Sequence, residues 1–216
     1  MRYTNPSDIE RRSFELISGE LSQRGITPDP VNADIVLRVI HTTADFDYAE
    51  QLVFSDGAVP RIREQFRQGC AIVTDTRMAQ AGIGKGRLAR YGIHVLCHMS
   101  DPDVAYRAAE LGITRAAVSM RKAFEESGDH PHPMLFAVGN APTALMELTK
   151  LIRDDGFRPA GVIAVPVGFV NVVEAKEEIL DTAKEAGIPC IAARGRKGGS
   201  TVAAAICNAL LLGLKP

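Results

Sequence analysis

Five short apolar runs divide the middle and C-terminal parts of the chain, and each is followed by a turn and then a helix-like stretch. The runs lie at 71–74, 93–97, 134–138, 161–165 and 189–193. Runs of this length with few polar residues are typical of parallel strands that are buried on both faces. We therefore expect an α/β fold with three layers, α/β/α, in which helices cover both faces of a mostly parallel sheet of about five strands.

Helical spacing dominates the chain before the first run. Apolar residues recur from Ile9 to Leu21, and Gly25 follows, which predicts a helix that starts after residues 5–7 and stops at the glycine. Ser13 would then lie in the middle of this helix. A later helix is expected over 58–68.

A second helix is predicted from the pair Asp29 and Pro30, which suits the N-cap and the first helical position. Its apolar face would contain Val31, Ile35, Val36, Val39 and Ile40. Arg38 and His41 lie near its C-terminal end, three residues apart and so on neighbouring faces.

Composition limits the classes of partner. The chain has 216 residues, 46% hydrophobic and 24% charged, with a formal net charge of −1, which is the balance of a globular protein with no general attraction for nucleic acid or anionic membranes. We expect a single domain over 1–216 and, since the N-terminus lacks the pattern of a signal peptide, a cytoplasmic location. The apolar stretch 202–214 is too short to span a bilayer and is expected as a buried helix.

The four cysteines, Cys70, Cys97, Cys190 and Cys207, are scattered through apolar runs and form no CxxC pair. Neither a disulfide framework nor a zinc site is expected.

Segments that follow the apolar runs are candidates for a binding site, because ligands of open α/β sheets lie outside the carboxyl ends of the strands. Three of them are distinctive: 139–143 and 194–200 combine glycine with polar or charged residues, and 166–169 is Pro-Val-Gly-Phe. The last contains three glycines and three cations directly before a helix, and its backbone N–H groups can hold a carboxylate or a phosphate. The alternative is a tight turn with solvated charges.

Segment 82–87, Gly-Ile-Gly-Lys-Gly-Arg, contains similar residues but lacks the spacing of the GxxxxGK[ST] and GxGxxG nucleotide motifs. It is interpreted as a basic loop at the edge of a pocket or as a plain surface loop.

His41 is the strongest candidate for proton transfer. It leaves an apolar helix and precedes hydroxyl and carboxyl side chains in His-Thr-Thr-Ala-Asp-Phe-Asp at 41–47, and histidine exchanges protons near neutral pH. A purely structural role is the alternative. The sequence shows no convincing nucleophile–base pair, HExxH motif or paired-carboxylate motif that competes with it.

The other histidines are weaker candidates. His94 lies within a strand run and is expected in the core or at an edge, whereas His98 follows the end of that run and can line a pocket. His130 and His132 form an HxH pair in the surface loop expected at 125–133, but no further ligands cluster with them. No metal site is predicted.

Several arginines can bind an anion. Arg115 follows Gly-Ile-Thr at 112–114, where a helix is expected to begin, so its guanidinium and the helix N-terminus can face one ligand. Arg38 and Arg121 are also candidates. Individually, each arginine is more often a surface charge.

Five motifs in order resemble those of the precorrin-8X methylmutases, or precorrin isomerases, of corrin-ring (vitamin B12) biosynthesis, and the resemblance runs nearly end to end. The motifs are Glu-Arg-Arg-Ser-Phe at 10–14, Arg-Val-Ile-His-Thr-Thr-Ala-Asp at 38–45, Gly-Asn-Ala-Pro-Thr-Ala-Leu at 139–145, Pro-Val-Gly-Phe-Val at 166–170 and Arg-Gly-Arg-Lys-Gly-Gly-Ser at 194–200.

The resemblance implies an isomerase that shifts a methyl group within a tetrapyrrole, from ring carbon eleven to ring carbon twelve, without cofactor, methyl donor or protein-bound metal. The substrate would be precorrin-8X or cobalt-precorrin-8 and the product hydrogenobyrinate or cobyrinate. The sequence of 41–47 resembles more closely the enzymes of the early-cobalt (anaerobic) route, whose substrate is cobalt-precorrin-8. The family also implies a homodimer.

The same resemblance assigns the role of acid catalyst to His41. The expected substrate-binding residues are Ser13, Arg38, Thr114, Arg115, Asn140, Gly168, Arg194, Gly198 and Ser200. Cations and backbone donors spread over a wide cleft suit a macrocycle fringed by carboxylates.

Two other classes of function remain open from the residues alone. A non-catalytic tetrapyrrole carrier would use the same cations and cleft without a proton donor. A nucleotide-dependent α/β enzyme would use the glycine segments 82–87 or 194–200.

Overall fold

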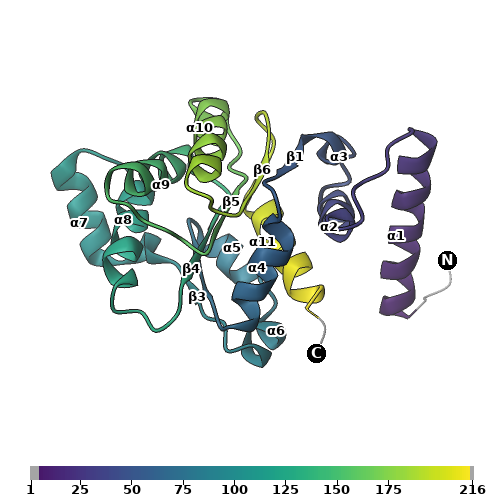
Figure 1. Cartoon of the computed structure of the whole chain (residues 1–216), viewed down its shortest axis with the longest axis horizontal. Helices are drawn as coiled ribbons and strands as arrows, with labels where there is room; N and C mark the ends of the chain where they lie inside the picture. The colour runs from purple at the N-terminus through teal and green to yellow at the C-terminus, as the bar shows by residue number, and fades with distance from the viewer. Residues whose placement is uncertain (1–4, 215–216) are drawn as a thin grey trace.

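The computed structural model describes residues 5–214, which form one six-stranded sheet flanked by helices (Figure 1). The strands are β1 (Leu52–Phe54), β2 (Ala71–Thr74), β3 (Val95–Leu96), β4 (Met134–Val138), β5 (Gly161–Ala164) and β6 (Cys190–Ala193). Their order is β1-β6-β5-β4-β2-β3, and every neighbouring pair is parallel except β1 and β6. The expected α/β fold with a mostly parallel sheet is confirmed.

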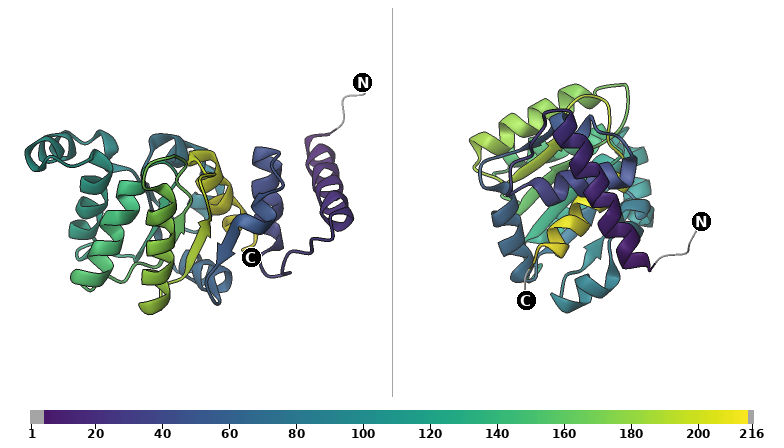
Figure 2. Two further views of the ribbon diagram at one scale, coloured as in Figure 1. Left: turned by 90° about the horizontal axis from the view of Figure 1, so that it is seen from above. Right: turned by 90° about the vertical axis from the view of Figure 1, so that its right-hand side faces the viewer.

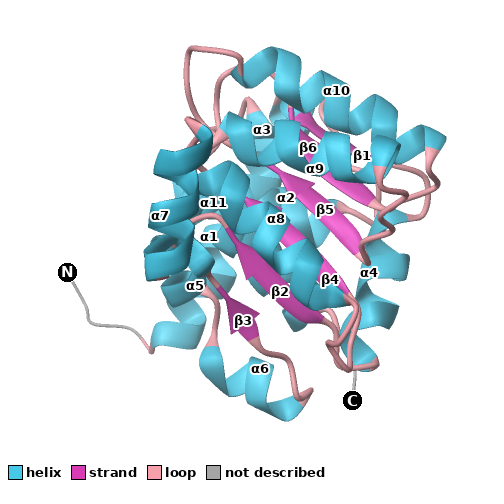
Figure 3. Ribbon diagram, turned by 90° about the vertical axis from the view of Figure 1, so that its left-hand side faces the viewer, coloured by secondary structure: helices cyan, strands magenta, loops and turns pink. Residues whose placement is uncertain are grey.

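Helices lie on both faces of this sheet. The helices of the described residues are α1 (Pro6–Gln23), α2 (Ala33–Thr43), α3 (Tyr48–Gln51), α4 (Ala58–Arg67), α5 (Arg77–Gly82), α6 (Lys85–Arg90), α7 (Pro102–Leu111), α8 (Arg115–Ser127), α9 (Pro142–Asp154), α10 (Val172–Glu185) and α11 (Ser200–Leu212), with a short 3-10 helix, η1, at His98–Ser100. One face packs against α8, α9 and α10, which Figure 3 shows in front of the strands, and the other packs against α11, α4 and α5.

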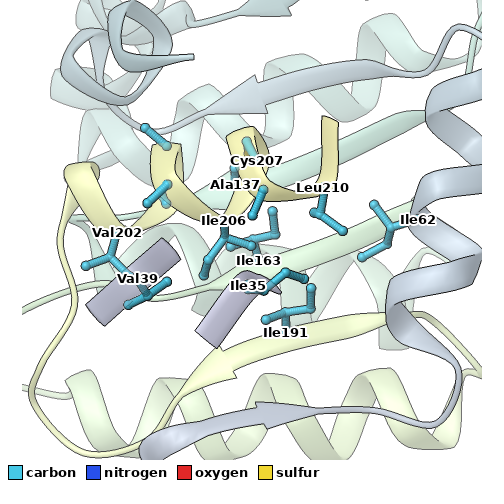
Figure 4. Packing of buried hydrophobic residues seen from close by; sticks show 14 of the residues in the cluster. Ile35, Val39, Ile62, Ala137, Ile163, Ile191, Val202, Ile206, Cys207 and Leu210 are labelled. Atoms are coloured by element: carbon cyan, nitrogen blue, oxygen red, sulfur yellow. The ribbon is translucent and has the colours of Figure 1, made fainter. Parts of the chain in front are cut away.

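Helix α11 forms the centre of the second face. It is apolar nearly all round, which is typical of a helix buried between other elements. Figure 4 shows Ile206 and Leu210 packed over the sheet residue Ile163, with Ile35 of α2 and Ile62 of α4 beside them. The buried helix expected at 202–214 is confirmed.

The strands agree best with the sequence where a run is buried on both sides. The ranges 71–74 and 134–138 are those of β2 and β4, whereas β3 is shorter than the run 93–97 and lies at the edge of the sheet. A sixth strand, β1, was not expected. It has three residues and pairs antiparallel with β6 at the other edge, and so short a segment between two helices has no visible period.

The start of the second helix was predicted wrongly. Asp29 does not cap it: the Asp29 carboxylate accepts the N–H of Val31 at 2.8 Å and its carbonyl accepts the N–H of Asn32 at 2.9 Å, which forms a turn. The helix begins only at Ala33, and Val31 is exposed rather than part of the apolar face. The remaining four residues of that face are buried.

Helix α1 confirms the first predicted helix and stands at one end of the molecule, beside α2 and away from the sheet (Figure 2). The chain turns after it at Gly25, whose φ of 72° favours glycine. Among the described residues, no helix is long and apolar enough to cross a membrane.

Candidate active site

The segments that follow the parallel strands meet at one edge of the sheet. The hydroxyl of Thr76, after β2, lies 2.8 Å from that of Ser200 at the start of α11. The N–H of Gly199 donates to the carbonyl of Val165, after β5, at 2.9 Å. Because these strands run in the same direction, their carboxyl ends bring together residues that are far apart in the sequence.

Asp75 holds the segment after β4 in place. Its buried carboxylate accepts the N–H groups of Gly139, Asn140 and Ala141, each at 2.8 Å. Burial raises the pKa of Asp75, and the three N–H groups oppose that shift because they favour the charged form. The sequence reasoning missed this residue, although an acid directly after a buried run was a usable signal.

Two glycines allow the loops at this edge to approach closely. A Cβ atom on Gly139 would lie 2.8 Å from the Cα of Ser200, and one on Gly198 would overlap the carbonyl oxygen of Val165. Both positions therefore exclude side chains. The predicted residues Asn140, Gly198 and Ser200 are neighbours for this reason.

Two lysines anchor the segment 194–200, and neither was predicted. Lys176 of α10 is fully buried and donates to the carbonyls of Gly195 at 3.0 Å and Lys197 at 2.7 Å. Burial lowers its pKa to about 8. Lys197 donates to Asp45 and Asp47, both at 2.6 Å, and these hydrogen bonds raise the pKa of Lys197 and lower that of Asp45. The loop is thereby tied to the segment that follows α2.

His41 lies in the last turn of α2, three residues before the C-cap residue Ala44. Its exposed ring faces Phe14 of α1, with 5.2 Å between ring centroids. The guanidinium of Arg38 lies 4.7 Å from the centre of the Phe14 ring and donates to Glu10 at 2.5 Å. That hydrogen bond lowers the pKa of Glu10.

Ser13 is on the same helix as Phe14, but its hydroxyl donates to the carbonyl of Ile9 at 2.8 Å, within α1. Phe14 thus brings α1 against Arg38 and His41, whereas the hydrogen bond described for Ser13 stays within α1.

A cavity of about 540 Å³ adjoins this cluster, and we call it the α2–α11 cavity. Arg38 and Thr42 of α2 line it together with Thr201 and Asn208 of α11. Gly82, Gly84 and Arg87 also line it, so the glycine segment lies at the edge of a cavity, as a link between α5 and α6. His41 is not among the lining residues and lies next to them in the sequence.

Thr114 and Arg115 lie at the start of α8. The hydroxyl of Thr114 accepts the N–H of Ala117 at 3.2 Å and lies 2.7 Å from the hydroxyl of Thr143 at the start of α9. Arg115 is exposed and forms no ion pair with any described residue. Arg121, in contrast, forms an ion pair with Glu147 that joins α8 to α9.

Gly168 and Arg194 lie at the outer side of the loops. The N–H of Gly168 donates to the carbonyl of Arg196 at 3.2 Å. The exposed side chain of Arg194 lies 3.3 Å from Glu177 of α10 and points toward that helix. Phe169 is 80% exposed, and the guanidinium of Arg196 lies over its ring.

The other histidines take no part in this cluster. His94 is exposed next to the edge strand β3, and His98 is buried with its Nδ1 2.9 Å from Asp101 rather than lining a cavity. His130 and His132 lie close together in the turn after α8, which extends to Ser127, so the expected surface loop is shorter than 125–133. No group of three potential metal ligands occurs among residues 5–214.

The fold and this site define an α/β protein that presents a histidine, arginines and glycine loops at the carboxyl edge of a parallel sheet, an arrangement suited to a large anionic ligand. The sequence model of the precorrin-8X methylmutase family matches residues 8–212, and the chain belongs to this family. It is therefore an isomerase of the methylmutase class, which moves a methyl group in cobalamin biosynthesis.

Known relatives cover almost the whole chain. The cobalt-precorrin-8 methylmutase of Salmonella typhimurium is 44% identical over 217 residues, which is 97% of this chain and 96% of the relative. That of Priestia megaterium is 41% identical over 95% of this chain and 87% of the relative. The crystal structure of precorrin-8x methyl mutase from Thermus thermophilus superposes with a TM-score of 0.82 at 37% identity, covering 94% of this chain and 96% of that one.

Proposed function

We propose that the protein converts cobalt-precorrin-8 to cobyrinate by moving the methyl group from ring carbon eleven to ring carbon twelve, with His41 as the general acid. The observation that carries this proposal is the position of His41, whose exposed ring stands beside Arg38 and next to Thr42 of the α2–α11 cavity. A protonated imidazole there donates its proton to a ring nitrogen of the macrocycle. The proton draws electron density from the conjugated system, the methyl group migrates, and the same proton returns.

The substrate carboxylates need partners spread around the macrocycle. Arg38 can accept one in place of Glu10, because an ion pair with a half-exposed carboxylate contributes only about 0–1 kcal/mol and is exchanged at little cost. Ser13 lies one residue before Phe14, whose ring contacts both Arg38 and His41. We assign the remaining contacts to two groups of residues: Asn140, Gly198 and Ser200 in the loops after β4 and β6, and Thr114, Arg115, Gly168 and Arg194 at the start of α8 and at the outer side of the loops.

The cobalt form is proposed because the two relatives described above carry that substrate in their names and because the motif at 41–47 is similar to that of the early-cobalt branch. The cobalt ion belongs to the substrate in this proposal. Free thiols at all four cysteines support action in the reducing cytoplasm.

The test is incubation of the purified protein, without oxygen, with cobalt-precorrin-8 and with precorrin-8X. We expect the visible absorption spectrum to change with both substrates, because the shifted methyl group rearranges the conjugated system, and kcat/KM to be higher for the cobalt form. Faster conversion of the metal-free form would contradict the cobalt preference alone. An unchanged spectrum with both substrates would contradict the methyl migration itself.

We also propose that the chain forms a homodimer through α1. This helix packs against α2 and leaves Ile9 and Leu16 more than half exposed, and exposed apolar side chains on an outlying helix favour a partner surface. Sedimentation equilibrium is expected to give twice the mass of one chain for the wild type, and Leu16→Glu is expected to shift it toward the monomer. A wild-type monomer at micromolar concentration would contradict the proposal.

A further inference from the structure

Two buried side chains of opposite charge lie beneath the two glycine loops. Asp75 accepts three N–H groups of residues 139–141, and Lys176 donates to two carbonyls of the segment 194–200. The amide donors of 139–141 are therefore already hydrogen-bonded inside the protein. In the segment 194–200, two carbonyl acceptors are hydrogen-bonded instead.

The carbonyl contacts of Lys176 fix the direction of two peptide units. In a trans peptide the C=O and N–H bonds point in opposite directions, and the described chain contains no cis peptide. The carbonyls of Gly195 and Lys197 point at the ammonium group, so the N–H groups of Arg196 and Gly198 point away from it. Neither N–H donates a hydrogen bond to any residue of 5–214.

Helix α11 begins directly after these two peptides. The N–H groups of Ser200 and Thr201 have no acceptor within the helix, as in the first turn of any α-helix. Free amide donors and a helix N-terminus together form an anion-binding concavity. The two loops therefore suit different ligands. The carboxylate of Asp75 lies under 139–141 and occupies its amide donors, whereas the ammonium group of Lys176 lies under 194–200 and leaves amide donors free for an anion.

We propose that Lys176 is the positioning residue that makes 194–200 a carboxylate-binding loop, by turning the N–H groups of Arg196 and Gly198 toward an acidic side chain of the macrocycle. This inference rests on the proposed function for the identity of the ligand. Lys176 has no carboxylate within hydrogen-bonding distance among the described residues, and a buried ammonium without such a partner is costly to keep. The loop carbonyls and the bound carboxylate provide the compensating interactions.

The hydrogen bonds of Asp75 limit how the loop 139–141 can contact the substrate. Since the N–H groups of 139–141 already donate to Asp75, that loop contacts the substrate through the side chain of Asn140, which is exposed. The substrate carboxylate is directed to 194–200. Lys197 ties the loop 194–200 to Asp45, two residues after the end of α2, so the position of this loop is fixed relative to His41.

The test compares Lys176→Met with Lys184→Met, an exposed lysine on the same helix. We expect Lys176→Met to raise KM about tenfold or more and to change kcat less than about threefold, because a contact with a remote carboxylate is made equally in the ground state and the transition state. Lys184→Met is expected to leave both parameters unchanged. An unchanged KM in folded Lys176→Met, or a loss confined to kcat, would overturn the inference.

A second measurement needs no variant and covers the case in which Lys176→Met does not fold. Amide hydrogen exchange of the wild type, resolved to single residues by NMR, is followed with hydrogenobyrinic acid and with its fully amidated form as probes. Protection of Arg196 and Gly198 by the acid alone is expected. Equal protection by both probes, or none by the acid, would refute the role of the loop.

The two proposals fail separately. If the wild type leaves both tetrapyrrole substrates unchanged but the acid still protects the two amides, the proposed reaction is wrong and the loop assignment stands. If turnover occurs without protection, the loop assignment is wrong and the reaction stands.

Discussion

Replacement of His41 by alanine is expected to lower kcat by about 10²–10⁴-fold while binding of the corrinoid product changes by less than about threefold. The imidazole is the proposed proton donor, and its removal leaves Arg38 and the glycine loops in place to hold the carboxylates. Turnover is measured from the change in absorbance, and binding from a fluorescence titration with hydrogenobyrinic acid. The experiment separates chemistry from recognition, because a tetrapyrrole carrier would need no proton donor.

Two variants sharpen the interpretation. His41→Phe keeps an aromatic ring opposite Phe14, which lies 5.2 Å from the His41 ring, but it has no proton to donate, so it is expected to lose as much activity as the alanine variant. His94→Ala removes an exposed histidine from the edge of the sheet and is expected to leave kcat unchanged. Undiminished isomerisation by His41→Ala would exclude the general-acid role. Recovery of activity in His41→Phe would show that the ring acts by packing.

The parts of the fold that could be predicted are those in which local pattern and burial agree. Strands β2 and β4 are fully buried, and their residues carry an unbroken apolar signal. Strand β1 is held by its pairing with β6, a contact between residues far apart in the sequence, so no local pattern indicated it. The start of α2 was misplaced because Asp29 and Pro30 suit a turn as well as a helix cap.

The site residues were likewise predictable only where a local sequence pattern indicated them. His41 and Arg38 could be selected because the sequence offers no competing catalytic motif and because the motif at 38–45 resembles that of the family. Lys176 could not, because it stands between acidic neighbours in Glu-Ala-Lys-Glu-Glu at 174–178, a pattern typical of a solvated helix face. Only the packing of α10 against the loop makes it a buried donor. Whether a glycine loop presents free N–H groups or free carbonyls depends on the charged side chain buried beneath it, and the glycines alone do not indicate this.

Asp75→Asn is expected to destabilise the protein by about 2–4 kcal/mol, because a carboxamide cannot replace a carboxylate that accepts three N–H groups. One carboxylate oxygen accepts Gly139 and the other accepts Asn140 and Ala141. In either orientation of the asparagine, its NH2 group faces at least one of these donors, which is left buried without an acceptor. Relief of the carboxylate's burial offsets part of this cost and keeps the net loss below the sum of the broken bonds.

For a chain of this length, that loss corresponds to a fall in Tm of roughly 4–16 °C in calorimetry or thermal circular dichroism. Asp181→Asn, at an exposed position of α10, is the matched control and is expected to keep the wild-type Tm. The surviving folded protein should also lose turnover, because Gly139 sits against Ser200 and a shifted loop displaces the start of α11. A Tm within about 2 °C of the wild type would mean that the three N–H groups find other acceptors, and that Asp75 does not hold the loop.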